Sequence, residues 1–449
     1  MAGTGIAPAR DWRETPLARI ISPMQRFIHS ETSGGLVLIA ATILALILAN
    51  SPLSSAYMGV LKSYIGISVG PFELRENVLH WINDGLMALF FFVVGLELKR
   101  EAIVGELANP RNAILPIVAA IGGAAIPALI YVALNAGGPG SAGWGVPMAT
   151  DIAFALGVLA LLGDRAPFAL KVFLTAVAVI DDLLAVLIIA LFYSGELNYT
   201  ALGIGFIFLA LLAVTNLTGV RRTIVYVALG LIVWLAFLQS GVHATIAGVL
   251  VALTIPARNR INPDLFLERA RGLLAQFERT DPGQERMMTD ERQQSAVYEL
   301  EAACEEVQAP LQKIEHALHP WVAFGVIPIF ALANAGVQLS PDALGGDAMP
   351  IILGVTLGLV LGKPIGIMLT SWLLVRFSVV ALPRGVTWRQ VLGVSFLAGI
   401  GFTMSLFIAT LAFGDGARLE AAKIGILGAS LIAGLAGYGL LRSGEPKSE

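Results

Sequence analysis

Residues 168–193 read FALKVFLTAVAVIDDLLAVLIIALFY, an apolar run that carries two adjacent aspartates, Asp181 and Asp182, near its middle. An apolar helix of about 20 residues crosses the ~30 Å hydrocarbon core of a bilayer. A charged side chain at the centre of such a helix costs roughly 2.5–3.5 kcal/mol to insert. The stretch therefore predicts a membrane-spanning helix whose aspartates face a polar protein interior instead of lipid.

The composition of the whole chain agrees with a membrane protein. Of its 449 residues, 56% are hydrophobic and 14% are charged, against about 25% charged in soluble domains. The net charge of -3 provides no basic field for nucleic acid. The single cysteine, Cys304, cannot form an internal disulfide, and no Cys/His group has zinc-ligand spacing. We expect no nucleic-acid binding, no cofactor and no structural metal.

Apolar runs of sufficient length recur along the chain and predict about twelve spans of an all-α polytopic membrane protein. The run at 223–255 is too long for one crossing, and Gln239, Ser240 and Gly241 divide it. The predicted spans are 34–49, 80–98, 113–135, 144–162, 168–193, 199–217, 223–238, 242–255, 319–337, 349–375, 388–413 and 421–441.

Lys and Arg residues collect in the loops that follow alternate spans, as they do in cytoplasmic loops. The alternation predicts a multi-pass protein with both termini in the cytoplasm. The residues that carry it are Arg10, Arg13, Arg19, Arg26, Lys99, Arg100, Arg111, Arg165, Lys171, Arg221, Arg222, Arg376, Arg384 and Arg389. The exceptions are Lys62, Arg75, Arg418 and Lys423.

One loop differs in kind, because residues 258–315 hold twelve acidic and eight basic residues. Its stretch 265–278 has a helical pattern, and we interpret the loop as a solvated connector with short helices; a regulatory element is the alternative. The chain then divides into a cytoplasmic segment 1–33, spans one to eight in 34–257, the charged loop 258–315, spans nine to twelve in 316–441, and a cytoplasmic tail 442–449.

Residues 64–74 read YIGISVGPFEL and alternate apolar with small residues around a Val-Gly-Pro turn. The pattern predicts a short extracellular β-hairpin between spans one and two. An exposed strand edge can pair with another chain, which suggests a homodimer formed through this hairpin.

Four ionisable residues lie near the middle of predicted spans: Asp151, Asp181, Asp182 and Lys363. A buried ion-pair network that only fixes helix packing predicts matched charge, yet three carboxylates face one ammonium. Close carboxylates repel one another, which favours proton uptake by one of them. Carboxylate oxygens are also ligands that hard cations prefer. The set therefore predicts a membrane-embedded site where a cation and protons compete.

The backbone near two of these spans has the composition of an interrupted helix. Residues 143–151 read GWGVPMATD and residues 398–405 read AGIGFTMS. Glycine and small polar residues at mid-membrane are typical of discontinuous helices, whose ends carry opposite partial charges. Asp151 would offset helix N-termini and Lys363 helix C-termini. The alternative is that glycine only permits close helix packing.

The motifs at these positions resemble those of the NhaA family of bacterial Na+/H+ antiporters. They are ATDIAF at 149–154, VIDDL at 179–183, FALANAGV at 330–337, GKPIG at 362–366 and GIGFTMS at 399–405. The likeness extends from about residue 30 to 440. It implies twelve helices in the bacterial inner membrane, with inverted repeats of spans three to five and ten to twelve and crossing discontinuous spans four and eleven.

The resemblance also implies a function and its residues. The expected activity is electrogenic, pH-regulated export of Na+ or Li+ in exchange for protons. Asp181 and Asp182 match the cation and proton carboxylates, Thr150 and Asp151 lie on the broken helix, and Lys363 can pair with Asp181. Residues implied in the pH response are Asp84, Glu97, Glu101, His243 and Glu315.

Alternatives stay open for some of these residues. A solvated helix end also explains Glu97 and Glu101, and His243 can be a packing residue. Because the insert 258–312 departs from the compact family pattern, the pH threshold is not transferred. Two other functions are a Na+-coupled symporter of an organic solute and an intramembrane aspartyl protease, whose Tyr-Asp and Gly-x-Gly-Asp contexts do not surround Asp181 and Asp182.

Overall fold

The structure is a computed structural model that describes residues 31–69, 72–257, 263–278, 291–338, 345, 348–383 and 385–443. The predicted cytoplasmic segment 1–33 lies outside this part except for its last three residues. So do the end of the tail, the start of the charged loop and its centre at 279–290.

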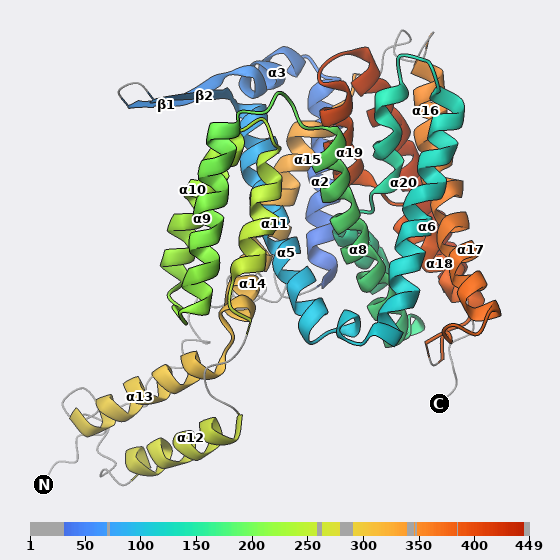
Figure 1. The fold of residues 1–449 in the computed structure, drawn as a ribbon. Helices are drawn as coiled ribbons and strands as arrows, with labels where there is room; N and C mark the ends of the chain where they lie inside the picture. The colour runs from blue at the N-terminus through green and yellow to red at the C-terminus, as the bar shows by residue number, and fades with distance from the viewer. Residues whose placement is uncertain are drawn as a thin grey trace, which may run out of the picture. The chain divides into compact units, whose positions relative to one another are not determined.

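The described chain is helical apart from one hairpin (Figure 1). In chain order the main elements are α2 (Glu31–Ala49), α3 (Ser54–Lys62), β1 (Tyr64–Val69), β2 (Phe72–Asn77), α4 (Val78–His80), η2 (Trp81–Leu86), α5 (Met87–Ile103), η3 (Glu106–Ala108), α6 (Pro110–Asn135), η4 (Ser141–Met148), α7 (Ile152–Ala160), η5 (Gly163–Arg165), α8 (Phe168–Phe192), α9 (Tyr199–Leu217), α10 (Thr223–Leu238), α11 (Ala244–Thr254), α12 (Pro263–Glu278), α13 (Glu291–Val307), α14 (Pro310–Trp321), η6 (Val322–Val326), α15 (Ile327–Asn334), α16 (Ala348–Leu357), η8 (Gly358–Gly362), α17 (Lys363–Arg376), α18 (Trp388–Ala398), α19 (Phe402–Phe413) and α20 (Ala417–Arg442).

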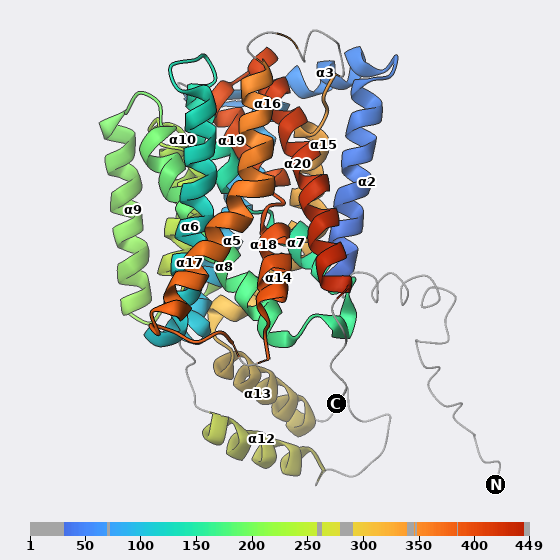
Figure 2. The same ribbon diagram turned by 90° about the vertical axis from the view of Figure 1, so that its right-hand side faces the viewer.

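The chain forms two compact units. Of the described residues, those within Met1–Asn83, Ile114–Ala185 and Pro320–Glu449 form the first, and those within Asp84–Ala113 and Val186–His319 form the second. In the first unit α20 packs against α16 and α18 (Figure 2). In the second, α11 packs along α5, α9 pairs with α10, and α12 pairs with α13 (Figure 1).

The predicted all-α membrane fold is confirmed. Eight helices in the described residues are long and apolar enough to cross a membrane, and two further spans arise if each of two bent helix pairs counts once. The bent pairs are α2 with α3 and α18 with α19. The helices α10 and α11 are apolar but shorter, and correspond to the divided run at 223–255. The count of twelve spans stays a prediction.

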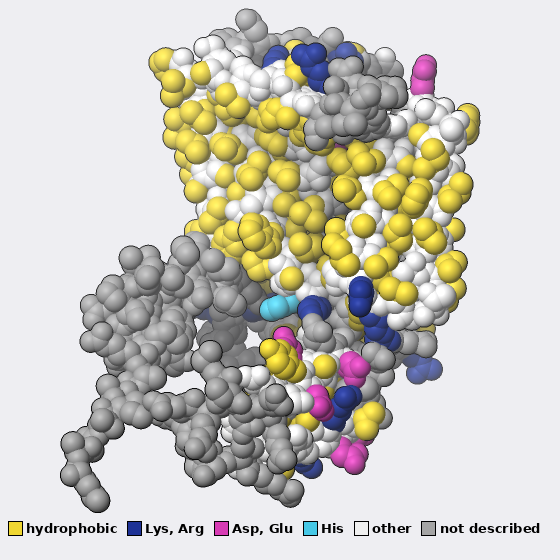
Figure 3. Space-filling view, turned by 90° about the vertical axis from the view of Figure 1, so that its left-hand side faces the viewer, with side chains coloured by type: hydrophobic (Ala, Val, Ile, Leu, Met, Phe, Trp, Pro, Cys, Tyr) yellow, Lys and Arg dark blue, Asp and Glu magenta, His cyan; other side chains and the backbone are white. Residues whose placement is uncertain are grey.

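Hydrophobic side chains cover the outside of these helices, as a hydrocarbon solvent requires. Figure 3 shows one face on which they form a broad band, with charged side chains gathered at its margins. On α9 and α10, for example, Phe206, Ile207, Ile224 and Val227 are each more than half exposed. These side chains would be unfavourable in water in such number, so the exposed apolar band marks a lipid-facing surface.

Side-chain caps explain where helices begin at the span ends. Asn198 accepts hydrogen bonds from the amides of Thr200 and Ala201 and starts α9. Thr387 and Gln390 form a reciprocal capping box at the start of α18. Such caps satisfy N–H groups that the first helical turn leaves without partners.

Glycines let helices approach closely within each unit. A Cβ at Gly366 of α17 would overlap the carbonyl of Gly122 on α6, and a Cβ at Gly248 of α11 would overlap the carbonyl of Ala88 on α5. Contacts of this kind are common where helices associate in lipid, because packing replaces the hydrophobic drive.

The region between spans one and two contains a helix as well as the predicted hairpin. β1 and β2 pair antiparallel from Tyr64 opposite Asn77 to Val69 opposite Phe72, which confirms the hairpin. Helix α3, whose axis bends 110° from that of α2, is not among the elements predicted from the sequence. In the charged loop, α12 confirms the helix expected at 265–278, and α14 begins at Pro310, so Glu315 lies inside a helix.

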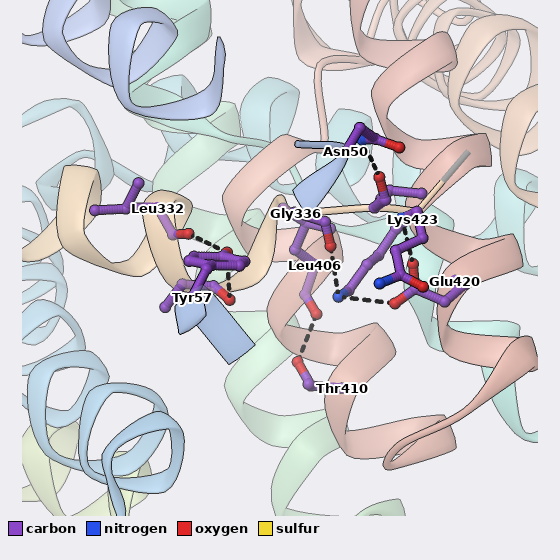
Figure 4. A network of polar contacts seen from close by, with 11 residues as sticks. Asn50, Tyr57, Leu332, Gly336, Leu406, Thr410, Glu420 and Lys423 are labelled. Carbon is purple, nitrogen blue, oxygen red and sulfur yellow. Dashed lines mark hydrogen bonds and ion pairs between the residues drawn. The ribbon is translucent and has the colours of Figure 1, made fainter. Parts of the chain in front are cut away.

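Two of the basic residues that depart from the loop pattern are held by hydrogen bonds. Lys423 is buried, and its Nζ donates to the carbonyl of Gly336 at 3.3 Å and pairs with Glu420 at 3.2 Å (Figure 4). Arg418 donates to the carbonyl of Pro139 at 3.0 Å. Both side chains lie near the N-terminal end of α20 and donate hydrogen bonds to carbonyl groups of other loops.

Candidate functional site

An ion pair joins Lys363 of α17 to Asp181 of α8 inside the first unit. Its Nζ to Oδ2 distance is 2.5 Å, and each side chain is 1% exposed. The same Nζ donates to the carbonyl of Met148, the last residue of η4. Lys363 follows the π-helical turn η8 and begins α17. One ammonium therefore links an aspartate on a continuous helix to the end of an interrupted one.

Both predicted interruptions are present, and they touch each other. Helix η4 ends at Met148 and α7 begins at Ile152, while α18 ends at Ala398 and α19 begins at Phe402. The amide of Asp151 donates to the carbonyl of Ile400 at 2.7 Å. A Cβ at Gly399 would meet the carbonyl of Leu359 at 2.5 Å. The glycines of span eleven therefore serve both the break and close packing, the two alternatives that the sequence left open.

Asp151 caps two helices at once. Its Oδ1 accepts from the amide of Phe154 at 2.9 Å in its own helix, α7. Its Oδ2 accepts from the amide of Thr403 at 3.1 Å and from the Thr403 hydroxyl at 2.5 Å, in α19. A carboxylate at a helix N-terminus satisfies free N–H groups and offsets the positive end of the helix dipole. Asp151 therefore accepts hydrogen bonds from the N-terminal turns of both α7 and α19.

The C-terminal ends of η4 and α18 accept hydrogen bonds from side chains. Besides Lys363 on Met148, the Thr150 hydroxyl donates to the carbonyl of Ala398 at 2.8 Å. The Ser405 hydroxyl donates to the carbonyl of Val146 at 2.7 Å. The C-terminal end of each half-helix is thus contacted by a side chain from the other interrupted helix or from α17. All of these side chains are buried.

Several of these capping residues are not apparent as such from the sequence. They are Thr403, Ser405 and Ser430, and Ser430 of α20 accepts a hydrogen bond from the amide of Phe402 at 3.2 Å. Thr403 and Ser405 lie in the quoted stretch at 398–405, so its small polar residues were the available signal. Ser430 lies in an ordinary apolar helix and gives no such signal.

Asp182 is buried beside the ion pair, with 1% of its surface exposed. It interacts electrostatically with Lys363, as Asp181 does. Two carboxylates of one helix therefore share a single ammonium, while the charge of Asp151 is taken up by two helix N-termini. The two carboxylates thus outnumber the ammonium between them, and carboxylate oxygens are ligands that hard cations prefer.

In the second unit, Arg100 of α5 brings together carboxylates of the predicted pH-response set. It pairs with Glu315 of α14 at 3.0 Å and with Glu101 at 3.2 Å. Glu97, one turn earlier on α5, interacts electrostatically with Glu315, Arg100 and Glu101. In the sequence, Arg100 is one of the basic residues that indicate loop sidedness, and its central position among these carboxylates could not be predicted.

The other two residues of that set meet at a different place. Asp84 lies 3.8 Å from Nδ1 of His243, at the start of α11. Thirteen residues separate Asp84 from Glu97, which is about 20 Å at a helical rise of 1.5 Å. The five residues therefore form two groups, one around Arg100 and one formed by Asp84 with His243.

Lys99 holds the far end of α11, the helix that begins directly after His243. Its Nζ donates to the carbonyl of Leu253 at 2.7 Å and to that of Ile255 at 2.5 Å. These carbonyls lie at the C-terminal end of α11, where a cation also offsets the helix dipole. Neighbouring Lys99 and Arg100 thus have separate structural partners.

Comparison with known proteins is consistent with this geometry. Residues 25–441 match the family described as Na+/H+ antiporter 1. The chain belongs to this family. It is 51% identical over 427 residues to the Na+/H+ antiporter NhaA of Oleidesulfovibrio alaskensis, covering 95% of each chain. It is 47% identical over 429 residues to NhaA of Koribacter versatilis, covering 96% of this chain and 93% of the relative.

Membership of the Na+/H+ antiporter 1 family confirms the resemblance inferred from the motifs. A third relative, NhaA 1 of Saccharophagus degradans, is 48% identical over 433 residues. The family is one of membrane transporters by its description, which does not favour the intramembrane protease or the organic-solute symporter. The motifs that carry the resemblance are the same segments that form the two breaks and the Lys363–Asp181 pair.

Proposed function

We propose that this chain exports Na+ or Li+ in exchange for protons, electrogenically and under the control of pH. The observation that carries the proposal is the buried Lys363–Asp181 ion pair with Asp182 beside it, at the meeting point of two interrupted helices. The printed names of the relatives, Na+/H+ antiporter NhaA, support the same activity.

The exchange follows from competition for carboxylate oxygens. A Na+ ion that binds at Asp182 and Asp181 takes the place of the Lys363 ammonium as the counter-charge of Asp181. Protonation of the carboxyl groups removes the negative charge that holds the cation, so the cation leaves. Because a bound cation and bound protons exclude one another, each cycle exchanges one for the other.

The charge carried per cycle depends on how many groups release protons. Two groups that each give up a proton for one bound Na+ move one net charge across the membrane. The membrane potential acts on moved charge at about 2.3 kcal/mol per 100 mV, so it would drive export. Thr150 and Asp151 belong to this site as the residues that hold the broken helix, with Asp151 and Lys363 compensating the helix ends.

Regulation is assigned to the second unit. Glu97, Glu101 and Glu315 around Arg100 form one proton-responsive group, and Asp84 with His243 forms another. The helices α12 and α13 lie in the long charged loop before Glu315, and we assign them as a solvated connector that can adjust the response.

The same proposal covers location and assembly. The chain lies in the bacterial inner membrane with both termini in the cytoplasm, as the loop charges indicate. The β1–β2 hairpin lies on the opposite side, where its free strand edge would pair with a second copy to form a homodimer.

Purified protein reconstituted in proteoliposomes tests the function. Proton flux would be followed with a pH-sensitive dye while Na+, Li+ or K+ is added across a range of pH, with and without an imposed potential. We expect flux with Na+ and Li+, little with K+, and a rate that responds to the potential. Solute uptake coupled to Na+ without proton counterflow would contradict the proposal.

A further inference from the structure

An apolar cavity of about 350 Å³ lies in the first unit beneath α3. Side chains from α2, α3, α15 and η2 line it, and all are hydrocarbon except for one hydroxyl. The lining residues are Leu48, Leu53, Ala56, Tyr57, Val60, Leu61, Ile82, Ile329, Leu332 and Ala333.

The one polar atom of the lining is already used. The Tyr57 hydroxyl donates to the carbonyl of Leu332 at 2.6 Å (Figure 4). An ordered water needs two to four polar partners, and dry apolar cavities instead accept apolar guests. The lining therefore favours a hydrocarbon occupant over water.

Helix α3 has the pattern of a helix that lies in a membrane interface. Leu53, Ala56, Tyr57, Val60 and Leu61 repeat at three- and four-residue intervals and face the cavity. At about 100° per residue, Lys62 falls on the opposite face of the helix, and its side chain is exposed. The 110° bend after α2 turns α3 away from the direction of the span. An apolar face with a cation opposite is typical of interfacial helices.

The rim of the cavity is open and apolar. Leu53, Val60 and Ile329 are 59%, 63% and 45% exposed. In a membrane protein such a rim contacts acyl chains, so the cavity connects with the hydrocarbon of the bilayer. A water-sized group such as a methylene occupies ~30 Å³. The cavity volume therefore holds an acyl-chain segment of roughly ten methylene groups.

We propose that this cavity binds one acyl chain of an anionic phospholipid, whose phosphate contacts Lys62 at the other face of α3. Lys62 departs from the loop-charge pattern, and this contact gives it a role at the lipid headgroups. The proposal is independent of the antiport activity, since none of the lining residues belongs to the cation site.

Substitution inside the cavity tests the acyl-chain site. The full-length protein would be purified in detergent, and retained phospholipid would be counted by native mass spectrometry. Ala56→Phe fills the cavity and is expected to lower retention more than about tenfold, because losing the burial of two methylenes already weakens binding that much. Ser55→Phe adds the same ring at an exposed neighbouring position outside the lining and should leave retention unchanged.

A rim variant covers the case in which Ala56→Phe does not fold. Val60→Trp places bulk over the mouth at an exposed position, and it is expected to reduce retention in the same way. Unchanged lipid retention in whichever variants fold would overturn the proposal. Loss of dimer with unchanged lipid would also overturn it, by assigning the cavity to a second copy of the chain.

The headgroup contact has its own test. Wild-type protein should retain phosphatidylglycerol in preference to phosphatidylcholine when both are supplied in mixed micelles. Lys62→Gln is expected to remove this preference while total retention stays. Equal retention of the two lipids by the wild type would contradict the assignment of an anionic lipid.

Discussion

Asp151 and Thr403 are joined by two hydrogen bonds across 252 positions of sequence, one from the Thr403 amide and one from its hydroxyl, both to the same carboxylate oxygen. The other oxygen of Asp151 accepts from Phe154. One buried carboxylate thus stabilises the N-termini of α7 and α19, and the two interrupted helices are held as one structure.

Substitution of Asp151 should lower the free energy of unfolding more than substitution of Thr403. Asp151→Ala leaves both N-termini uncapped, and we expect a loss of about 1–4 kcal/mol in the free energy of unfolding. Thr403→Val removes only the hydroxyl donor and should lose about 0.5–1.5 kcal/mol. Thermal unfolding in detergent measures both. An Asp151→Ala protein with the wild-type midpoint would show that the cap does not stabilise the fold.

The Lys363–Asp181 pair should behave as a coupled unit. Lys363→Met leaves Asp181 and the Met148 carbonyl buried without their cation, which we expect to destabilise the protein by about 3–5 kcal/mol. Adding Asp181→Asn removes the orphaned charge, so the double variant should be more stable than Lys363→Met alone. A double-mutant cycle with purely additive effects would contradict a direct interaction.

Lys423 should matter more for stability than its partner Glu420. Lys423→Met removes the donor to the buried Gly336 carbonyl, and we expect a loss of about 1–3 kcal/mol. Glu420→Gln weakens only a partly exposed ion pair, which contributes less than about 1 kcal/mol. Unfolding midpoints compare the two. The reverse order would mean that the ion pair, and not the carbonyl contact, is the stabilising part.

The group around Arg100 predicts a change in the pH profile. Without the guanidinium, Glu315 and Glu101 lose the cation that pairs with them at 3.0 and 3.2 Å, and a nearby cation favours the ionised form of a carboxyl group. Arg100→Gln should therefore shift antiport activation toward alkaline pH, by on the order of one pH unit. The exposed Arg111→Gln, a charge loss of the same kind, is the control. Identical profiles for the two variants would remove Arg100 from the regulation.

Much of this arrangement could be predicted from the sequence, because charge is so expensive in a bilayer. Asp151, Asp181, Asp182 and Lys363 stand out for that reason, and the small residues before Asp151 mark the break. The partners of these residues could not be predicted, since hydroxyl groups such as that of Ser430 give no local pattern. A pairing such as Asp151 with Thr403 depends on the tertiary fold alone.

Helix α3 could not be predicted from the sequence for a different reason. Its nine residues, Ser54–Lys62, are too short and too mixed in polarity to satisfy the criterion for a span. Only the cavity beneath it and the bond from Tyr57 to Leu332 reveal which face is buried. Arg100 likewise has the sequence context of any cytoplasmic arginine, because its partner Glu315 lies more than 200 positions away.

The antiport rate of Asp182→Asn in proteoliposomes tests most directly whether Asp181 and Asp182 bind the exchanged ions. The exposed Asp415→Asn serves as the matched control. We predict that Na+-dependent proton flux falls to the level of protein-free vesicles in Asp182→Asn and stays at the wild-type level in Asp415→Asn. Near-normal flux in folded Asp182→Asn protein would contradict the account.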